Sequence, residues 1–295
     1  MSRPCRFSAL ALALWLITSH ALARAPSPTS PAYVSTGLGT VLEFTGPQTY
    51  TNYAVGLNNP SGVAVDRKGH VYVAEHTGGR ILKFTAPNVY TVYYANIDHP
   101  VALAFDGCNN LFATSVTTGT VLKITAPDQA MVYGAGLKRP AGLALDPQQR
   151  VYVSQMANSV DGSVVRFSGA GNYTSYAAGL QYPTNISFDS QGRLYVAEDT
   201  ATGDVRVYTA KDTSTVFAGG LSFPGGVFID PADVAFVTSP NSISTFTAPN
   251  TPTLYASGLF YPNSIAWKVE FKRHDDCERR EGETSGPERD SRRGD

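Results

Sequence analysis

Residues 56–66 read Gly-Leu-Asn-Asn-Pro-Ser-Gly-Val-Ala-Val-Asp, and near variants of this phrase recur along the 295-residue chain. The central prolines of the six copies are Pro60, Pro100, Pro140, Pro183, Pro224 and Pro262. Successive prolines stand 40, 40, 43, 41 and 38 residues apart. Repeats of about forty residues are typical of propeller blades and of paired-helix arrays.

The residues inside each period favour strands over helices. Every period holds short alternating runs rich in Val, Ile, Tyr, Phe and Thr, which is the pattern of half-buried strands. In the first period one run, Val63-Ala64-Val65, ends in Asp66, a second contains Tyr72, a third ends at Phe84 and a fourth reaches Tyr94. Four strands per repeat predict a propeller blade.

The two ends of the chain indicate how the ring closes. The last period has a first strand near Trp267 and none of the other three. The missing runs stand at the front, at Ala32–Ser35, Thr40–Phe44 and Tyr53–Leu57. We therefore predict an all-β, six-bladed propeller whose last blade combines three N-terminal strands with one C-terminal strand, which removes open sheet edges.

These repeats resemble the NHL-repeat family of six-bladed propellers. The copy that matches best comprises Gly56–Asp66, His70–Glu75 and Gly79–Phe84, and the resemblance covers about Ala32 to Trp267. It implies the fold more specifically than the function, because related propellers include extracellular sensors, protein-binding scaffolds, lactonases and lyases.

The chain outside the repeats divides into three further segments. Basic residues, a short apolar run and Ala21-Leu22-Ala23 predict a cleavable signal peptide over 1–23 and a secreted or periplasmic protein. A Pro/Ser linker over 24–31 precedes the propeller, 32–267. Of the last 28 residues, 268–295, 17 are charged, so we expect a disordered tail.

Charge excludes some partners of the propeller. Between Arg24 and Trp267 there are 13 basic and 15 acidic residues and no Lys/Arg stripe, so we predict no nucleic-acid binding. No stretch is long and apolar enough to embed the protein in a membrane. A Tyr-, Ser- and Thr-rich, charge-poor channel face favours a small molecule, a carbohydrate, or a peptide or protein as the partner. We expect the propeller to be a monomer.

Candidate binding residues follow the second run of each repeat. Because neighbouring strands are antiparallel, these residues and those after the prolines share the face around the central channel. On that face we select the most polar residues as ligand-binding candidates: Glu75, His76, Gln155, Glu198 and Asp199. The alternative is that Glu75 and Glu198 only bind backbone N–H groups of the following turn.

Two asparagines on the same face, Asn185 and Asn263, are further ligand-binding candidates and are also candidate metal ligands. Asn263, in Pro-Asn-Ser-Ile-Ala-Trp, resembles the Asn of the Pro-Asn-Gly segment in gluconolactonase and regucalcin propellers, with Ser264 in place of Gly. That resemblance implies Asn263 as a residue near a divalent cation such as calcium, and Asn185 is a second candidate because it also follows a repeated proline on this face. No acidic residue precedes the first runs as in those enzymes, so the full metal site is not carried over.

Two function classes follow from these residues. The first, which we favour, is a binding scaffold that uses its channel face and does no chemistry, because no complete catalytic constellation is present. The second is a divalent-metal-assisted lactonase or lyase, in which His76 or Glu75 acts as the base beside an ion near Asn185 and Asn263.

Overall fold

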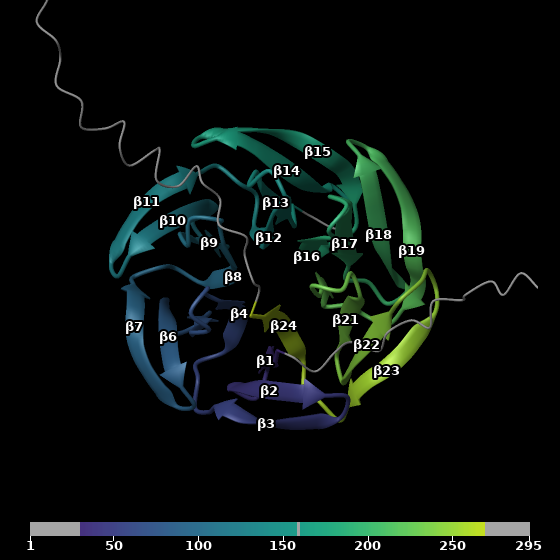
Figure 1. Cartoon of the computed structure of the whole chain (residues 1–295). Helices are drawn as coiled ribbons and strands as arrows, with labels where there is room; N and C mark the ends of the chain where they lie inside the picture. Colours follow the sequence, from purple (N-terminus) through teal and green to yellow (C-terminus); the bar gives the residue numbers. More distant parts are fainter. Residues whose placement is uncertain (1–29, 158–159, 269–295) are drawn as a thin grey trace, which may run out of the picture.

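The computed structural model describes residues 30–157 and 160–268. The expected signal peptide (1–23), nearly all of the linker (24–31) and all of the tail (268–295) except Lys268 lie outside the described residues. The described chain forms 24 strands in six four-stranded sheets arranged around a central axis (Figure 1). The described residues include no helix that could cross a membrane.

Every sheet contains an inner strand, which faces the axis, and a second strand beside it. The inner strands are β4 (Pro60–Val65), β8 (Pro100–Phe105), β12 (Pro140–Leu145), β16 (Pro183–Phe188), β20 (Gly226–Ile229) and β24 (Pro262–Trp267). The second strands are β1 (Ala32–Thr36), β5 (Val71–Glu75), β9 (Leu111–Ser115), β13 (Val151–Gln155), β17 (Leu194–Glu198) and β21 (Ala235–Ser239).

The third and fourth strands complete each blade toward the circumference. The third strands are β2 (Thr40–Gly46), β6 (Arg80–Ala86), β10 (Thr120–Ala126), β14 (Gly162–Gly169), β18 (Gly203–Ala210) and β22 (Ser242–Phe246). The outer strands are β3 (Thr49–Ala54), β7 (Val89–Ala95), β11 (Gln129–Gly134), β15 (Asn172–Leu180), β19 (Thr213–Leu221) and β23 (Pro252–Ser257). We number the blades from β4–β7 as blade 1 to β20–β23 as blade 5.

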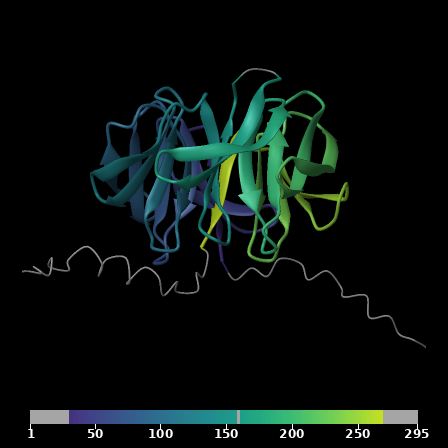
Figure 2. The same ribbon diagram turned by 90° about the horizontal axis from the view of Figure 1, so that it is seen from above.

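Blade 6 joins the two ends of the described chain. Its strand order is β24-β1-β2-β3, and β24 runs antiparallel to β1 with Val34 opposite Ile265. This confirms the predicted six-bladed fold and its closure. Seen from the side, the strands run roughly along the axis of the ring, with β24 near the centre (Figure 2).

Apolar side chains between neighbouring blades form the core. Between blades 1 and 2, Tyr72 packs edge-to-face on Tyr93 at 4.9 Å and on Phe105 at 5.0 Å between ring centroids. Phe84, Phe167 and equivalents on other blades are fully buried. The pair formed by Tyr72 and Tyr93, between the second and outer strands, has an edge-to-face counterpart in each of the other five blades, whereas the position of Phe105 on the inner strand is aromatic in only three of the six repeats.

The turns at the end of the ring remote from the candidate residues are structural. Asp66 follows β4, and its Oδ1 accepts hydrogen bonds from the N–H groups of Lys68 and His70 at 2.9 and 2.8 Å. Asp106, Asp146, Asp189 and Asp230 make the same pair of bonds in their own blades. These aspartates therefore fix the turns between the first two strands.

The turns between third and outer strands tie each blade to its predecessor. In all six blades a turn N–H donates to the carbonyl oxygen of an aromatic residue on the preceding outer strand, over 2.8–3.0 Å. The pairs are Gln48 to Tyr255, Asn88 to Tyr53, Asp128 to Tyr93, Gly171 to Tyr133, Asp212 to Tyr176 and Asn250 to Phe217.

Candidate functional site

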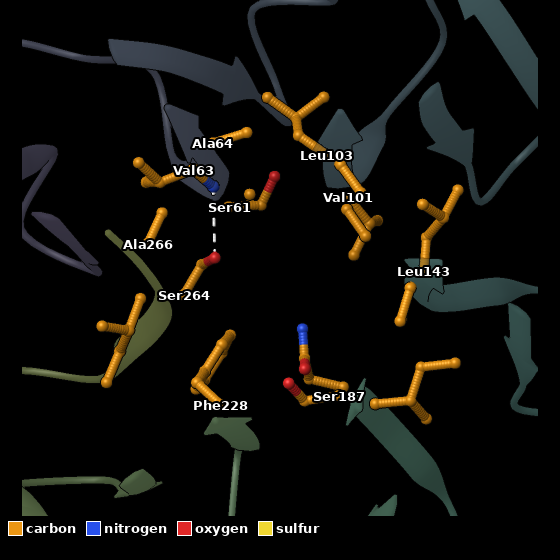
Figure 3. Close-up of a pocket in the computed structure, with 18 of the residues that line it drawn as sticks. Ser61, Val63, Ala64, Val101, Leu103, Leu143, Ser187, Phe228, Ser264 and Ala266 are labelled. Carbon is orange, nitrogen blue, oxygen red and sulfur yellow. Dashed lines mark hydrogen bonds between the residues drawn. The ribbon is translucent and has the colours of Figure 1, made fainter. Parts of the chain in front are cut away.

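The six inner strands enclose a channel cavity of about 520 Å³. Its wall is mostly apolar, with Val63, Leu103, Leu143 and Phe228 among the side chains that surround the opening in Figure 3. This composition follows from the sequence, because the inner strand of each repeat is a short run of Val, Leu, Ile and Ala. A cavity of this size is in the range of small-molecule sites.

The serine hydroxyls in the cavity wall bind backbone groups of neighbouring blades. Ser264 Oγ accepts the N–H of Val63 at 3.1 Å, the bond drawn in Figure 3. Ser61 Oγ donates to the carbonyl oxygen of Pro100 at 2.8 Å. These hydroxyls hold the inner strands together, so ligand recognition falls to other polar groups.

Glu75, Gln155 and Glu198 are buried at the ends of their second strands and are not among the residues that line the cavity. Glu75 Oε1 accepts the N–H of Asn58 at 2.8 Å, while Oε2 is paired with Arg80. The backbone group that Glu75 binds belongs to the connection before β4, whereas the sequence predicted the turn after β5.

The same arrangement recurs in two further blades. Glu198 accepts the N–H of Gln181 at 2.7 Å and pairs with Arg206 at 2.7 Å. Gln155 accepts the N–H of Lys138 at 2.7 Å and donates its amide to Ser163 Oγ at 3.2 Å. All three side chains thus fasten an incoming connection to its blade, and their polar atoms are occupied by the protein itself.

His76 lies at the channel mouth and lines the cavity. Its ring contacts that of His99 edge-to-face, with 4.8 Å between centroids. Its Nδ1 is buried and has no hydrogen-bond partner among the described residues. Burial, followed by the nearby His99, lowers the pKa of His76, and Asp98 acts in the opposite direction. The neutral imidazole is therefore favoured near neutral pH.

Asn185 and Asn263 line the same cavity from blades 4 and 6. Asn263 Nδ2 donates to the carbonyl oxygen of Pro60 at 3.1 Å, which leaves its Oδ1 for another partner. Asn185 Oδ1 is buried and has no hydrogen-bond partner among the described residues. The structure thus brings His76, Asn185 and Asn263 to one cavity.

A second cavity, which we call the mouth pocket, adjoins the channel across blades 4 to 6. It measures about 430 Å³ and shares Thr184, Gly225 and Asn263 with the channel cavity. Asp199, Phe223 and Tyr261 complete much of its wall. Burial raises the pKa of Asp199.

The residues before the repeated prolines form a ring that sequence reasoning missed. All six have a positive φ, between 43° and 54°: Asn59, His99, Arg139, Tyr182, Phe223 and Tyr261. In five blades the carbonyl oxygen of this residue accepts the N–H of the residue that directly follows the second strand, which is Gly37 in blade 6. Pro240 fills that slot in blade 5 and has no N–H to give.

The side chains of this ring differ around the channel mouth. Tyr182, Phe223 and Tyr261, on blades 4 to 6, are 41%, 48% and 54% exposed. Exposed aromatic side chains beside a cavity are typical of ligand-contacting positions. The signal was present in the sequence, since aromatic residues precede the last three repeated prolines.

Whether a divalent cation fits can be judged from the ligands on offer. The described residues contain no group of three or more His, Cys, Asp and Glu side chains that could hold a metal ion. Around the channel cavity the free oxygen ligands are amides, and the carboxylates of Glu75 and Glu198 are paired with arginines, so Asp199 in the adjoining mouth pocket is the one unpaired carboxylate among the described residues that line the two cavities. Calcium sites in proteins take six to eight oxygens, several from carboxylates. This set of ligands does not fit a resident cation.

Comparison with known proteins agrees with this fold. Residues 57–84 match the NHL repeat. A gluconolactonase from Xanthomonas campestris is similar in structure, with 15% sequence identity, a TM-score of 0.64, and coverage of 81% of this chain and 88% of that one.

A selenomethionine-substituted virginiamycin B lyase from Staphylococcus aureus is also similar, with 18% identity, a TM-score of 0.55, and coverage of 67% of this chain and 69% of the lyase. No curated protein matches the sequence. The chain is therefore a six-bladed propeller that carries an NHL repeat at residues 57–84 and is similar in fold to these lyase and gluconolactonase structures.

Proposed function

We propose that this protein is a secreted or periplasmic propeller that binds a ligand at its channel face. The observation that carries the proposal is that the channel cavity and the mouth pocket adjoin, with Thr184, Gly225 and Asn263 in the wall of both. Together they offer an apolar wall, a few uncommitted polar groups and an exposed aromatic rim. Such a combination is the usual composition of a ligand site.

The distribution of occupied and unoccupied polar groups supports the same face. Polar side chains that recur between blades, such as Asp66 and its counterparts in four further blades, hold turns together. Asn185 and His76, two side chains that vary between blades and keep a buried polar atom without a partner among the described residues, both line the channel cavity, whereas Thr238, whose hydroxyl is likewise without a partner, lines neither cavity. Side chains that differ between otherwise similar blades are the ones that can give a propeller fold a specific function.

A hydrolase or lyase is the second candidate. It is supported by the names of the structures that share the fold, a gluconolactonase and a lyase, and by the convergence of His76, Asn185 and Asn263 on one cavity. The lowered pKa of His76 would suit a proton acceptor. Glu75, in contrast, would have to leave Arg80 and the N–H of Asn58 to act as a base.

A fragment screen with two glycine variants tests the binding proposal. Gly225 lines both cavities, so Gly225→Phe adds a bulky side chain to the wall that they share; because its Cβ would lie 3.2 Å from the Thr238 hydroxyl, thermal unfolding first verifies that the variant is folded. Gly46→Phe is the matched control, because nothing lies within 4 Å of its added Cβ on an outer hairpin. Neutral and charged aromatic fragments are screened by ligand-observed NMR.

We expect hits on the wild type and on Gly46→Phe that are lost on Gly225→Phe. Hits that survive in Gly225→Phe, or the absence of hits on the folded wild type, would contradict a channel-face binding site. A parallel screen for hydrolysis of lactones and esters tests the enzyme alternative, which gains support only if activity appears and falls in His76→Gln.

A further inference from the structure

The mouth pocket contains a carboxyl group without a protein partner. Asp199 follows Glu198 in sequence, but the partners of the two carboxylates differ. Glu198 is paired with Arg206, whereas Asp199 makes no side-chain hydrogen bond or ion pair within the described structure. Burial raises the pKa of Asp199, which indicates that solvent does not fully replace the missing partner. A partly buried carboxylate of this kind is stabilised by an incoming positive charge.

The remaining wall of the pocket supplies acceptors and aromatic surface. Asn263 turns its amide nitrogen toward the carbonyl oxygen of Pro60, so its Oδ1 is left as an acceptor. Thr184 and Ser239 add hydroxyl groups. None of the described residues that line the pocket is Lys, Arg or His, so nothing in this wall neutralises Asp199.

Two aromatic side chains stand at the edge of the pocket. Phe223 and Tyr261 precede consecutive repeated prolines, and both are held in the left-handed region by their backbone, with φ of 48° and 43°. This conformation is costly for an aromatic residue and fixes the direction in which the side chain leaves the backbone. Both remain about half exposed, so their rings are accessible to a ligand.

We propose that the mouth pocket binds the ammonium or guanidinium group of an organic cation, with Asp199 as its counter-ion. Asn263 Oδ1 accepts a hydrogen bond from the cation, and Phe223 and Tyr261 contact it through their aromatic rings. The proposal rests on the proposed function and specifies the class of ligand. The unpaired charge favours a cation over a neutral sugar, which would leave Asp199 without a counter-ion.

The test compares a charged and a neutral ligand of the same shape. Benzylammonium and benzyl alcohol are titrated into the full propeller at pH 7.5 and low salt, with binding followed by NMR. Asp199→Asn keeps the shape of the side chain and removes its charge. Asp212→Asn is the matched control, because Asp212 lies on the outer hairpin of the same blade and Asn tolerates its φ of 54°.

We expect benzylammonium to bind the wild type and Asp212→Asn equally and to bind Asp199→Asn about tenfold more weakly, as for the loss of a close charge pair at a partly shielded site. Benzyl alcohol should bind all three proteins alike. Thermal unfolding of each variant verifies that it is folded.

The outcomes separate this proposal from the broader one. Equal binding of benzylammonium to the wild type and to Asp199→Asn would overturn the cation site. The channel-face proposal would still stand if benzyl alcohol bound the wild type and Gly225→Phe abolished this binding. If methyl glucoside binds the wild type and benzylammonium does not, the cation site is likewise overturned and the ligand class becomes a carbohydrate. If none of these ligands binds the folded wild type, both proposals fail.

Discussion

Asn263, next to the last repeated proline, donates its side-chain amide to the carbonyl oxygen of Pro60, the first repeated proline, over 3.1 Å. This bond crosses from blade 6 to blade 1, at the point where the ring closes. It also orients the amide, so that Oδ1 is available to the two cavities that Asn263 lines. One side chain therefore serves both closure and the candidate site.

Asn263→Ala should lower the stability of the propeller by about 1 kcal/mol, the usual cost of one such hydrogen bond. Urea unfolding measures this loss of stability, and the slope of the unfolding free energy against urea concentration should stay constant. Asn172→Ala is the control, because Asn172 donates only to nearby Ala170 at an exposed turn. Equal midpoints for the two variants would show that the Asn263 bond does not support closure.

Glu75→Ala should destabilise more than Glu75→Gln. The Ala variant leaves Arg80 and the N–H of Asn58 without their buried carboxylate partner, at a cost of about 1.5–3 kcal/mol, the usual contribution of a hydrogen bond to a charged group. Gln can still accept the N–H, as Gln155 does from Lys138 in blade 3. Urea unfolding compares the two. A Gln variant as unstable as the Ala variant would mean that the pairing with Arg80 supplies most of the stabilisation.

Asp199→Asn should stabilise the free protein at neutral pH. Because burial raises the pKa of Asp199, the folded state binds the proton more strongly than the unfolded chain, and stability falls as pH rises from the ordinary value of 3.8 through the raised value. The gain from Asn is therefore present at pH 7 and disappears toward pH 3. Thermal unfolding of variant and wild type across this range checks it, and a gain that grows toward acid would contradict the raised pKa.

Much of the fold could be predicted because the phrase around Pro60 recurs six times, and each copy carries the alternation and turn residues of its strands. The candidate site was predicted less well. Glu75 and Glu198 are acidic residues on the correct face, but whether they face the channel depends on Arg80 and Arg206, which lie on the adjacent third strands. The pattern of a single strand does not record such cross-strand partners.

Two residues of the mouth pocket, Asp199 and Asn263, were among the predicted binding residues, but its aromatic edge was missed for a related reason. Aromatic residues stand before the last three repeated prolines in the sequence, yet nothing in the strand alternation marks Phe223 and Tyr261 as exposed. Only the left-handed backbone before each proline directs these residues to the channel rim.

The dialysed propeller, residues 24–267, should retain no stoichiometric calcium or zinc, because the described residues of the two cavities offer one unpaired carboxylate, Asp199, besides amide oxygens, and no group of three His, Cys, Asp or Glu side chains. Elemental mass spectrometry measures the content, and millimolar calcium should leave the melting temperature unchanged. One retained ion per chain that is lost in Asn263→Ala would contradict this and make the lactonase or lyase alternative the leading one.

His76 should titrate below the ordinary histidine pKa of 6.5. Burial is the largest cause of the lowered pKa. The ring of His99, whose centroid lies 4.8 Å from that of His76, is the second cause, and Asp98 raises the pKa against both. The folded state then binds its proton less readily than the unfolded chain, so this group removes stability as pH falls from about 6.5 through the lowered value.

His76→Gln should therefore gain stability relative to the wild type between pH 7.5 and 5.5. His99→Gln should raise the pKa of His76 by removing the neighbouring imidazole that lowers it, which the Cε1–H resonance of His76 would report in an NMR titration. A His76 that titrates in the folded protein at or above its value in an unstructured peptide would show that water reaches the ring freely, and would remove the case for a neutral base at the channel mouth.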